Sequence, residues 1–260
     1  VPPQARPLCP PAGQAGIRRQ MEQLKREYEK QDRMRRDFTA NVSHELKTPL
    51  TSISGYAEII REGMVKSEDV GRFAGKIYEE AQRLITLVED ILNLSHLDEG
   101  APGQERRQGI DLYALCERAV ASLAEAARQR GIAISLTGSR QRVDGAEKLL
   151  AEIIFNLCDN AIKYNQENGH VAVSVTREGD RVVLTVQDTG IGIPPGETDR
   201  VFERFYRVDK SHSKEITGLG LSIVKHAAAY HDAKIQLDSQ LGRGTRVRVL
   251  FPLSQREAQP

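Results

Sequence analysis

The sequence predicts an α+β protein in two parts: a helical hairpin that pairs with a second copy as a four-helix bundle, followed by an α/β sandwich. Between residues 17 and 91, apolar side chains recur at alternating spacings of three and four. That period is typical of helices packed as in a coiled coil. Beyond residue 110, segments with helical and strand periods alternate, which indicates helices layered on a sheet.

The hairpin is predicted from two apolar stripes. Gly63 is expected to end the first helix, and Ser67 to begin the second. One hairpin alone would expose most of both stripes, so we expect a homodimer that buries them in a four-helix bundle. The first stripe comprises Ile17, Met21, Leu24, Tyr28, Phe38, Val42, Leu46, Leu50, Ile53, Ala57 and Ile60, and the second comprises Val70, Phe73, Ile77, Ala81, Leu84, Val88 and Ile91.

Composition and period divide the chain into five segments. Residues 1–16 are rich in Pro, Gly and Ala and are expected to be a disordered leader. The hairpin occupies 17–100, a linker 101–109, the second domain 110–253 and a tail 254–260. Within the second domain we expect helices at 112–130, 146–164 and 219–230, and strands at 132–137, 170–176, 181–187, 233–237 and 245–250.

The bulk composition excludes several classes of protein. A net charge of +1 gives no global reason to expect a nucleic-acid partner. The three cysteines are odd in number and far apart, as in a reduced cytosolic chain. The sequence contains no signal peptide and no apolar run long enough to span a bilayer. We therefore expect a cytoplasmic location, with membrane contact only through an upstream segment of a longer parent anchored in the plasma membrane.

His44 is the first candidate for chemistry. It stands two residues from Val42 and two from Leu46, and a two-residue step turns a helix by about 200°. The imidazole therefore points away from the apolar stripe into solvent. A single exposed histidine usually has no function, but Glu45 follows it directly. That carboxylate can hydrogen-bond one ring nitrogen and leave the other as a nucleophile.

Two neighbours strengthen this interpretation. Thr48 lies one helical turn after His44 on the same face. Pro49 removes a helix hydrogen bond and crowds the carbonyl of Glu45. A kink beside an exposed histidine is an unusual choice for a purely structural helix.

A second group of polar residues lies on the helix predicted at 146–164. Asn156 and Asn160 are four residues apart and share one face. Two amide oxygens there suit Mg²⁺, which takes few protein ligands and completes its shell with water or phosphate. Lys163 lies near the same face, where it can bear on phosphate charge. The plain alternative, a solvated polar face, is about equally favoured by these residues alone.

Two glycine motifs complete the candidates. Asp188, Gly190 and Gly192 directly follow a predicted strand, where glycine lets the backbone approach a flat ligand and a carboxylate can accept from an exocyclic amine. Gly218 and Gly220 open a predicted helix, and the backbone N–H groups of a helix N-terminus bind phosphate. The charged segment 201–217 between them is predicted to be a lid. Ordinary turn chemistry is the alternative for each motif.

In this order and spacing, the motifs resemble those of sensor histidine kinases with an ATPase domain like those of gyrase, Hsp90 and MutL. SHELKTPL is similar to the family's H box, NLCDNAIKY to its N box, DTGIGIP to its G1 box, FERFYR to its F box and GLGLSIVKH to its G2 box. The resemblance covers about residues 30–252.

The resemblance implies ATP and Mg²⁺ as cofactors and assigns roles to these residues. His44 would be the phosphoacceptor, Glu45 its base, and Thr48 the residue that positions water for a phosphatase reaction. The remaining assignments are Asn156 and Asn160 for Mg²⁺; Lys163 and Tyr164 for the phosphates and base; Asp188, Gly190, Gly192 and Ile193 for the adenine pocket; Gly218, Leu219, Gly220 and Leu221 for the phosphate turn; and Arg204 or Arg207 for the γ-phosphate.

The function implied is ATP-dependent autophosphorylation of His44, transfer of the phosphoryl group to an aspartate of a response regulator receiver domain, and phosphatase activity toward that partner. Two alternatives remain. One is an ATP-binding module with impaired kinase activity that acts mainly as a phosphatase. The other is a gyrase-like ATPase switch that is not a kinase, against which the grouping of His44, Glu45 and Thr48 argues.

The sequence departs from the family pattern in two places. Glu215-Ile216-Thr217 leads directly into Gly218 where family members commonly have extra glycines. We expect a shorter and stiffer lid, which supports the phosphatase alternative. His231-Asp232-Ala233 stands where a glycine pair is frequent, and we expect this change to affect only a turn.

Overall fold

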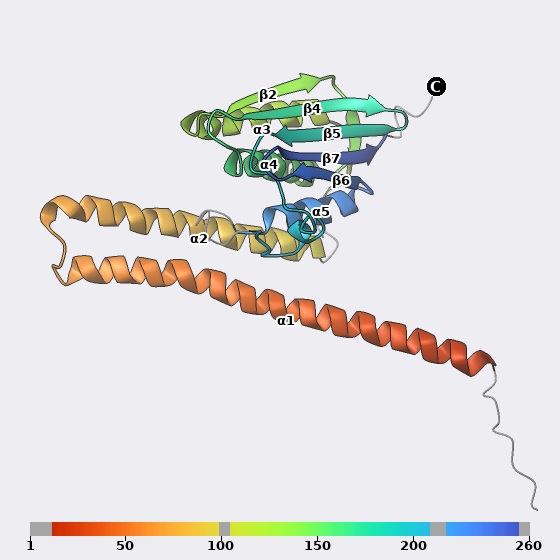
Figure 1. Cartoon of the computed structure of the whole chain (residues 1–260), viewed down its shortest axis with the longest axis horizontal. Coiled ribbons are helices and arrows are strands. Elements are labelled where there is room, and N and C mark those ends of the chain that lie inside the picture. The colour runs from red at the N-terminus through yellow and green to blue at the C-terminus, as the bar shows by residue number, and fades with distance from the viewer. Residues whose placement is uncertain (1–11, 99–104, 209–216, 255–260) are drawn as a thin grey trace, which may run out of the picture.

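The first part of the molecule is a helical hairpin, as predicted. The computed structural model describes residues 12–98, 105–208 and 217–254. Helix α1 (Ala12–Arg61) runs antiparallel to α2 (Val70–Asp98), and a 3₁₀ turn, η1 (Ser67–Asp69), leads into α2. Figure 1 shows the two helices side by side, with the N-terminal part of α1 extending past the end of α2. Residues 12–16 belong to α1, so the predicted disordered leader was wrong for them; residues 1–11 lie outside the described residues.

The hairpin turn follows from the sequence around Gly63. The Gly63 N–H donates to the carbonyl of Ile60 at 3.1 Å, and the Met64 N–H donates to that of Ile59 at 3.1 Å. These bonds satisfy carbonyl groups that the end of a helix leaves without an intrahelical partner. Gly63 therefore ends the first helix, as the sequence analysis predicted.

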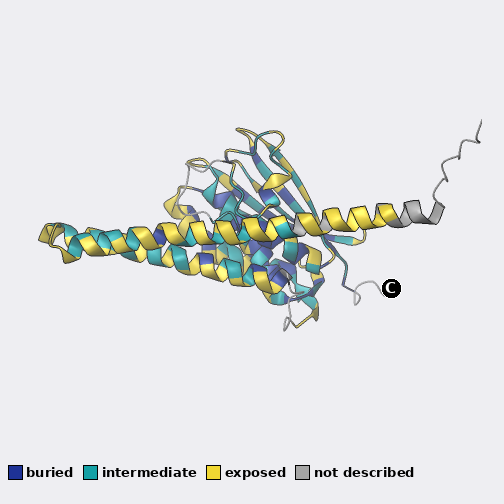
Figure 2. Cartoon of the chain, turned by 90° about the horizontal axis from the view of Figure 1, so that it is seen from below, coloured by how far each residue is buried: buried dark blue, intermediate teal, exposed yellow. Residues whose placement is uncertain are grey.

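The apolar residues of α2 divide between two faces. Leu87 and Leu94 are buried, and Leu84 and Ile91 are half-buried beside them. Three residues spaced seven apart are instead exposed: Tyr78 at 65%, Ile85 at 50% and Leu92 at 53%. Figure 2 shows exposed positions along much of the hairpin. The predicted stripe contained Leu84 and Ile91, and the three residues of the exposed face were not part of it.

The second part is the predicted α/β sandwich. Its large sheet has the strand order β2-β4-β5-β7-β6, in which only β2 and β4 pair in parallel. Figure 1 shows helices α3, α4 and α5 on one face of this sheet. The elements are β1 (Arg107–Asp111), α3 (Leu112–Gln129), β2 (Ala133–Gly138), β3 (Arg142–Gly145), α4 (Glu147–Lys163), β4 (His170–Glu178), β5 (Arg181–Asp188), η2 (Arg200–Phe202), α5 (Gly220–Tyr230), β6 (Lys234–Gln240) and β7 (Gly244–Pro252).

The core of the sandwich follows the strand period. Val171, Val173 and Val175 alternate along β4 and are fully buried. The other face of the sheet carries polar pairs, such as Arg248 with Glu178 at 2.6 Å. One apolar and one polar face is the expected pattern for a sheet covered by helices on one side only.

A small second sheet was not predicted. Strand β1 pairs antiparallel with β3, and the Gly109 N–H donates to Asp144 at 2.8 Å. The predicted linker 101–109 therefore includes the first three residues of a strand, 107–109. Both strands are short, and neither RQGID nor RVDG alternates apolar and polar residues, so neither shows a strand period.

His231 has a larger role than the turn that the sequence analysis expected. It is buried at the end of α5, where its Nδ1 donates to the carbonyl of Ala227 at 2.6 Å. Its Nε2 accepts from the N–H of Ala146 at 3.0 Å. The imidazole thus ties the end of α5 to the start of α4, and Asp232 takes the left-handed conformation of the turn with φ 52°.

Helix α2 packs against α5, so the two parts share one apolar core. Leu87, Leu94 and Leu97 of α2 belong to the same buried cluster as Ile223 and Ala227 of α5. This contact places the hairpin next to the start of α5 and next to residues 201–208, the described first part of the predicted lid.

Candidate functional site

Helix α1 presents His44 to solvent, as predicted. His44 is exposed, and the adjacent Glu45 is half-buried. The Thr48 hydroxyl donates to the carbonyl of His44 at 3.1 Å, which fixes Thr48 one turn along from the histidine. Pro49 lies within α1 and is buried, and the helix continues through it. An exposed imidazole and a hydroxyl therefore lie on adjacent turns of one helix.

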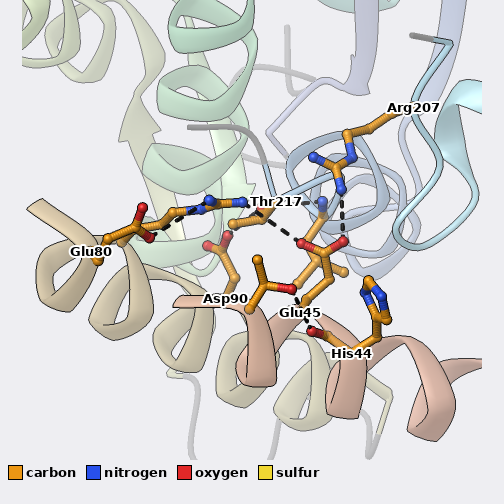
Figure 3. Close-up of polar contacts among 9 residues, drawn as sticks. His44, Glu45, Glu80, Asp90, Arg207 and Thr217 are labelled. Carbon is orange, nitrogen blue, oxygen red and sulfur yellow. Dashed lines mark hydrogen bonds and ion pairs between the residues drawn. The ribbon is translucent and has the colours of Figure 1, made fainter. Parts of the chain in front are cut away.

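Glu45 has partners that the sequence did not reveal. Its Oε1 pairs with Nη2 of Arg207 at 2.7 Å, and its Oε2 faces Nη2 of Arg83 on α2 at 3.9 Å (Figure 3). All three side chains are less than a fifth exposed. We expected the Glu45 carboxylate to accept a hydrogen bond from the His44 ring; instead, its two oxygens face arginines. The charge network links α1, α2 and the α/β domain.

The described first part of the predicted lid, residues 201–208, also packs directly on α1. The rings of Phe38 and Phe205 lie 5.7 Å apart, and the Arg204 guanidinium lies 5.2 Å from the centre of the Phe38 ring. Arg204 also contacts Nε2 of His226 at 3.3 Å. Both arginines that the sequence nominated for the γ-phosphate therefore lie against the helix that carries His44.

The predicted Mg²⁺ ligands lie on α4 against the start of α5. A Cβ built on Gly220 would stand 2.8 Å from Oδ1 of Asn156 and 3.5 Å from Nδ2 of Asn160. The Asn156 amide donates to the carbonyl of Glu152 at 2.9 Å, and this bond turns its oxygen toward the glycine. The missing side chain of Gly220 thus lets the start of α5 pack closely on both asparagines, so the predicted Mg²⁺ ligands and the predicted phosphate turn are neighbours.

Lys163 is held by a residue that the sequence analysis missed. Its Nζ pairs with Oδ2 of Asp159 at 2.7 Å, one turn back on α4. Both side chains are about a quarter exposed, so the ammonium group remains accessible. The i, i+4 spacing of opposite charges was the available signal for this pair.

Asp188, which we expect to bind the adenine amine, ends β5 and is half-buried. Oδ1 of Asp188 accepts from the N–H of Gly190 at 2.8 Å and from that of Thr245 at 3.1 Å. Burial raises the pKa of the Asp188 carboxyl, and these two hydrogen bonds oppose that shift. Among the described residues, nothing bonds its Oδ2, which leaves one oxygen to accept from a ligand.

The G1 glycines bring the backbone close to neighbouring segments. A Cβ on Gly190 would lie 2.2 Å from the carbonyl oxygen of Tyr164, which also accepts from the Ile191 N–H at 3.0 Å. Burial raises the pKa of the Tyr164 phenol. Gly192 approaches the carbonyl of Gln240 in the same way. The backbone at both glycines is thus packed closely against the main chain of neighbouring segments.

Ile193 and the residues of the G2 box complete the set of predicted nucleotide-binding residues. The Ile193 N–H donates to the Ser239 hydroxyl at 2.9 Å. Leu219 is buried and directly precedes Gly220 and Leu221, which open α5. These N–H groups at the start of an eleven-residue helix are suited to binding phosphate.

Gly218 is required by the turn that precedes α5. Its φ is 70°, and a Cβ there would meet the backbone carbon of Phe205 at 2.9 Å. The Phe205 N–H donates to the Gly218 carbonyl at 2.9 Å. Glu215 and Ile216, on which the prediction of a stiff lid depends, lie outside the described residues.

Two family models match the chain. The His Kinase A (phospho-acceptor) domain matches residues 34–100, and the histidine kinase-, DNA gyrase B- and HSP90-like ATPase matches residues 145–255. The chain belongs to the histidine kinase family. The two matches confirm the resemblance found in the sequence. They also confirm the two-part fold, in which the second part is a domain of the histidine kinase-, gyrase- and HSP90-like ATPase family.

Several curated relatives are sensor kinases. The chain is 39% identical over 229 residues to the sensor-like histidine kinase SenX3 of Mycolicibacterium smegmatis, which covers 87% of this chain and 59% of that protein. It is 35% identical over 237 residues to the sensor histidine kinase WalK of Bacillus subtilis, which covers 89% and 39% respectively. The chain thus spans less than two thirds of these relatives. None of the helices in the described residues is long and apolar enough to cross a membrane.

Solved histidine kinases share the fold. The Acinetobacter baumannii kinase AdeS matches 81% of this chain and 98% of its own, with a TM-score of 0.68 and 23% identity. The kinase ThkA, solved in complex with the response regulator protein TrrA, matches 89% of this chain and 67% of its own, also with a TM-score of 0.68, at 22% identity.

Proposed function

We propose that this chain transfers the γ-phosphoryl group of ATP to His44 and then passes it to an aspartate on the receiver domain of a response regulator. The observation that carries this proposal is the docking of the ATPase domain beside the phosphoacceptor helix. Arg207 bonds Glu45, the residue next to His44, and Phe205 packs on Phe38 of the same helix. The nucleotide-binding part and an exposed imidazole are thereby neighbours.

The residues support an in-line transfer. A ring nitrogen of His44 forms a bond to the γ-phosphorus, the bond from phosphorus to the ADP oxygen breaks, and the ring loses its N–H proton. Positioning and charge neutralisation provide most of the catalysis in such transfers. Asn156 and Asn160 would hold Mg²⁺, which neutralises phosphate charge when bound. Glu45 would accept the proton after it releases Arg207.

Arg207 is the better candidate for the γ-phosphate. It lies against the carboxylate next to the nucleophile, whereas Arg204 stacks on the Phe38 ring and contacts His226. A guanidinium that leaves Glu45 for the γ-phosphate would free the base and bind the substrate in a single movement. Thr48 would position water when the same site acts as a phosphatase.

We further propose that the kinase is a homodimer and works in the cytoplasm, where ATP and the receiver domain are found. Tyr78, Ile85 and Leu92 form an exposed apolar seam with a seven-residue repeat on α2, and exposed Leu50 lies on α1. Such a repeat is typical of helices that pack against a partner. Two hairpins would bury these seams in a four-helix bundle.

The test is incubation with Mg²⁺ and ATP labelled in its γ-phosphoryl group. We expect label that is lost in acid and kept in base, as for a phosphorus–nitrogen bond. His44→Gln should remove the label and keep ATP binding, because the imidazole lies outside the nucleotide pocket. Asn160→Asp should impair both binding and labelling, with the fold unchanged. Label that persists on His44→Gln would contradict the proposal.

A further inference from the structure

Asp90 on α2 is a carboxylate placed where the hairpin meets the ATPase domain. Its Oδ2 accepts a hydrogen bond from the Thr217 hydroxyl at 2.9 Å, across a sequence separation of 127 residues (Figure 3). Burial raises the pKa of the Asp90 carboxyl, and the bond from Thr217 and the charge of Lys163 oppose that shift. The carboxylate is therefore partly removed from water and depends on partners from the other domain.

Thr217 connects this bond to the phosphate turn. Its hydroxyl oxygen accepts from the N–H of Leu219 at 3.3 Å while its proton goes to Asp90. A hydroxyl has a single proton to donate, so the bond to Asp90 fixes the direction of the lone pairs that face Leu219. The hydrogen bonds run without interruption from α2 of the hairpin to the residue that precedes α5.

The bonds leave the phosphate-binding groups available. Thr217 occupies the N–H of Leu219, whereas the N–H groups of Gly220, Leu221 and Ser222 belong to the first turn of α5, which has no intrahelical acceptors for them. The turn is held in place by an acceptor outside its own domain. The neighbouring charges of Asp159 and Glu89 oppose ionisation of Asp90, so Thr217 and Lys163 are the groups that compensate it.

We propose that Asp90 is a positioning residue for ATP. In the docked arrangement it holds Thr217, and through it the turn of residues 217–220, in the conformation that receives the phosphates. A movement of α2 against α5 would change the affinity of the turn for ATP. Because such coupling is reciprocal, ATP bound at the turn favours docking of the hairpin. The inference rests on the proposed kinase function, which it extends from the nucleotide pocket to a residue of the hairpin.

The test uses the full chain and steady-state autophosphorylation. Asp90→Ala and Thr217→Val should each raise KM for ATP by about fivefold, the effect of one lost hydrogen bond, with a smaller change in kcat. Asp90→Asn and Thr217→Ser keep an acceptor and a donor in place and should stay near wild type. Glu79→Ala, which removes an exposed carboxylate elsewhere on α2, is the matched control.

The double variant decides whether the two residues act together. If they form one connection, Asp90→Ala with Thr217→Val should be no worse than the more impaired single variant. Additive effects, a wild-type KM in Asp90→Ala, or an Asp90→Asn variant as impaired as Asp90→Ala would each overturn the inference. Absence of label on the wild-type chain would instead overturn the proposed function, and affinity for a non-hydrolysable ATP analogue would still test the turn.

Discussion

The position of Thr48 is fixed by the backbone of the residue one turn before it. Its hydroxyl donates to the carbonyl of His44 at 3.1 Å, and the residue is exposed. Thr51 makes the same bond to the carbonyl of Lys47 at 2.9 Å. The two threonines are therefore alike in local structure and differ in their distance along the helix from His44.

We expect Thr48→Ala to leave autophosphorylation of His44 unchanged and to slow dephosphorylation of the partner regulator. Loss of a group that positions the attacking water should cost on the order of tenfold or more. The rates are measured with phosphorylated receiver domain and ADP. Thr51→Ala is the control and should behave as wild type; equal phosphatase rates in Thr48→Ala and wild type would remove Thr48 from the mechanism.

His231 gives the ATPase domain a dependence on pH. Burial lowers the pKa of the imidazole from its ordinary value of 6.5, because it disfavours the charged form. The charge of Arg106 lowers the pKa further, while the hydrogen bonds with Ala227 and Ala146 and the charge of Asp232 raise it. The unfolded chain therefore binds a proton at a pH where the folded chain does not. As a result, the free energy of unfolding decreases as the pH falls below 6.5.

Denaturant unfolding at several pH values between neutral and 5 tests this expectation. The wild-type free energy of unfolding should fall by up to about 1.4 kcal/mol per pH unit more than that of His231→Gln, which has no proton to take up. His170→Gln, at an exposed position, is the control for a general effect of removing a histidine. Parallel curves for wild type and His231→Gln would contradict the assignment.

At the scale of helices and strands, the sequence was informative wherever the period was strong. Helix α4 and the hairpin β4–β5 were predicted within a few residues because their apolar positions alternate without interruption. Strands β1 and β3 were missed because they depend on pairing between segments that are far apart in the chain. Local patterns carry no information on such pairing.

The candidate site shows the same limit. His44, Asn156, Asn160 and Asp188 were found because each stands in a short motif with a local geometry. Arg83 and Asp90 were missed, since the hydrogen bond of Asp90 spans 127 residues and its partner lies in another domain. Glu45 was found but given the wrong partner, because Arg207 is 162 residues away.

The contact between α1 and residues 201–208 gives a prediction at this scale. Phe38→Ala removes the ring that packs on Phe205 and Arg204, and an aromatic pair contributes about 0.5–1.5 kcal/mol beyond its buried area. We expect autophosphorylation to slow by about three- to tenfold, with ATP affinity kept.

A second aromatic pair in the same hairpin supplies the control. The rings of Tyr56 and Phe73 also lie 5.7 Å apart, at the end of the hairpin nearer the turn. Phe73→Ala should cost comparable stability and leave the rate per folded molecule unchanged. A loss of rate of the same size in both variants would show that general destabilisation, not docking, limits the reaction.

At the scale of the whole molecule, α2 carries a row of exposed apolar residues on one face. Tyr78, Ile85 and Leu92 recur every seven residues, and all three are at least half exposed. Leu84 and Ile91, which belong to the stripe predicted for the second helix, are half-buried instead, and Ile91 packs against the core shared with the ATPase domain. Substituting those two would disturb the fold of one protomer and could not report on a dimer.

Ile85→Lys therefore tests the dimer. In a four-helix bundle each copy would bury one unpaired ammonium group, so dimerisation should weaken by on the order of a hundredfold or more. Thr86→Lys places the same charge on the adjacent, exposed position of α2 and should leave the dimer intact. Sedimentation at micromolar protein gives the mass of each variant, and circular dichroism reports whether the helices persist.

A monomeric wild type, or a dimer of unchanged strength in Ile85→Lys, would show that this seam is not the interface. Conversely, a monomeric Ile85→Lys that still labels His44 at the wild-type rate would show that each protomer phosphorylates its own histidine on the arrangement seen between Arg207 and Glu45.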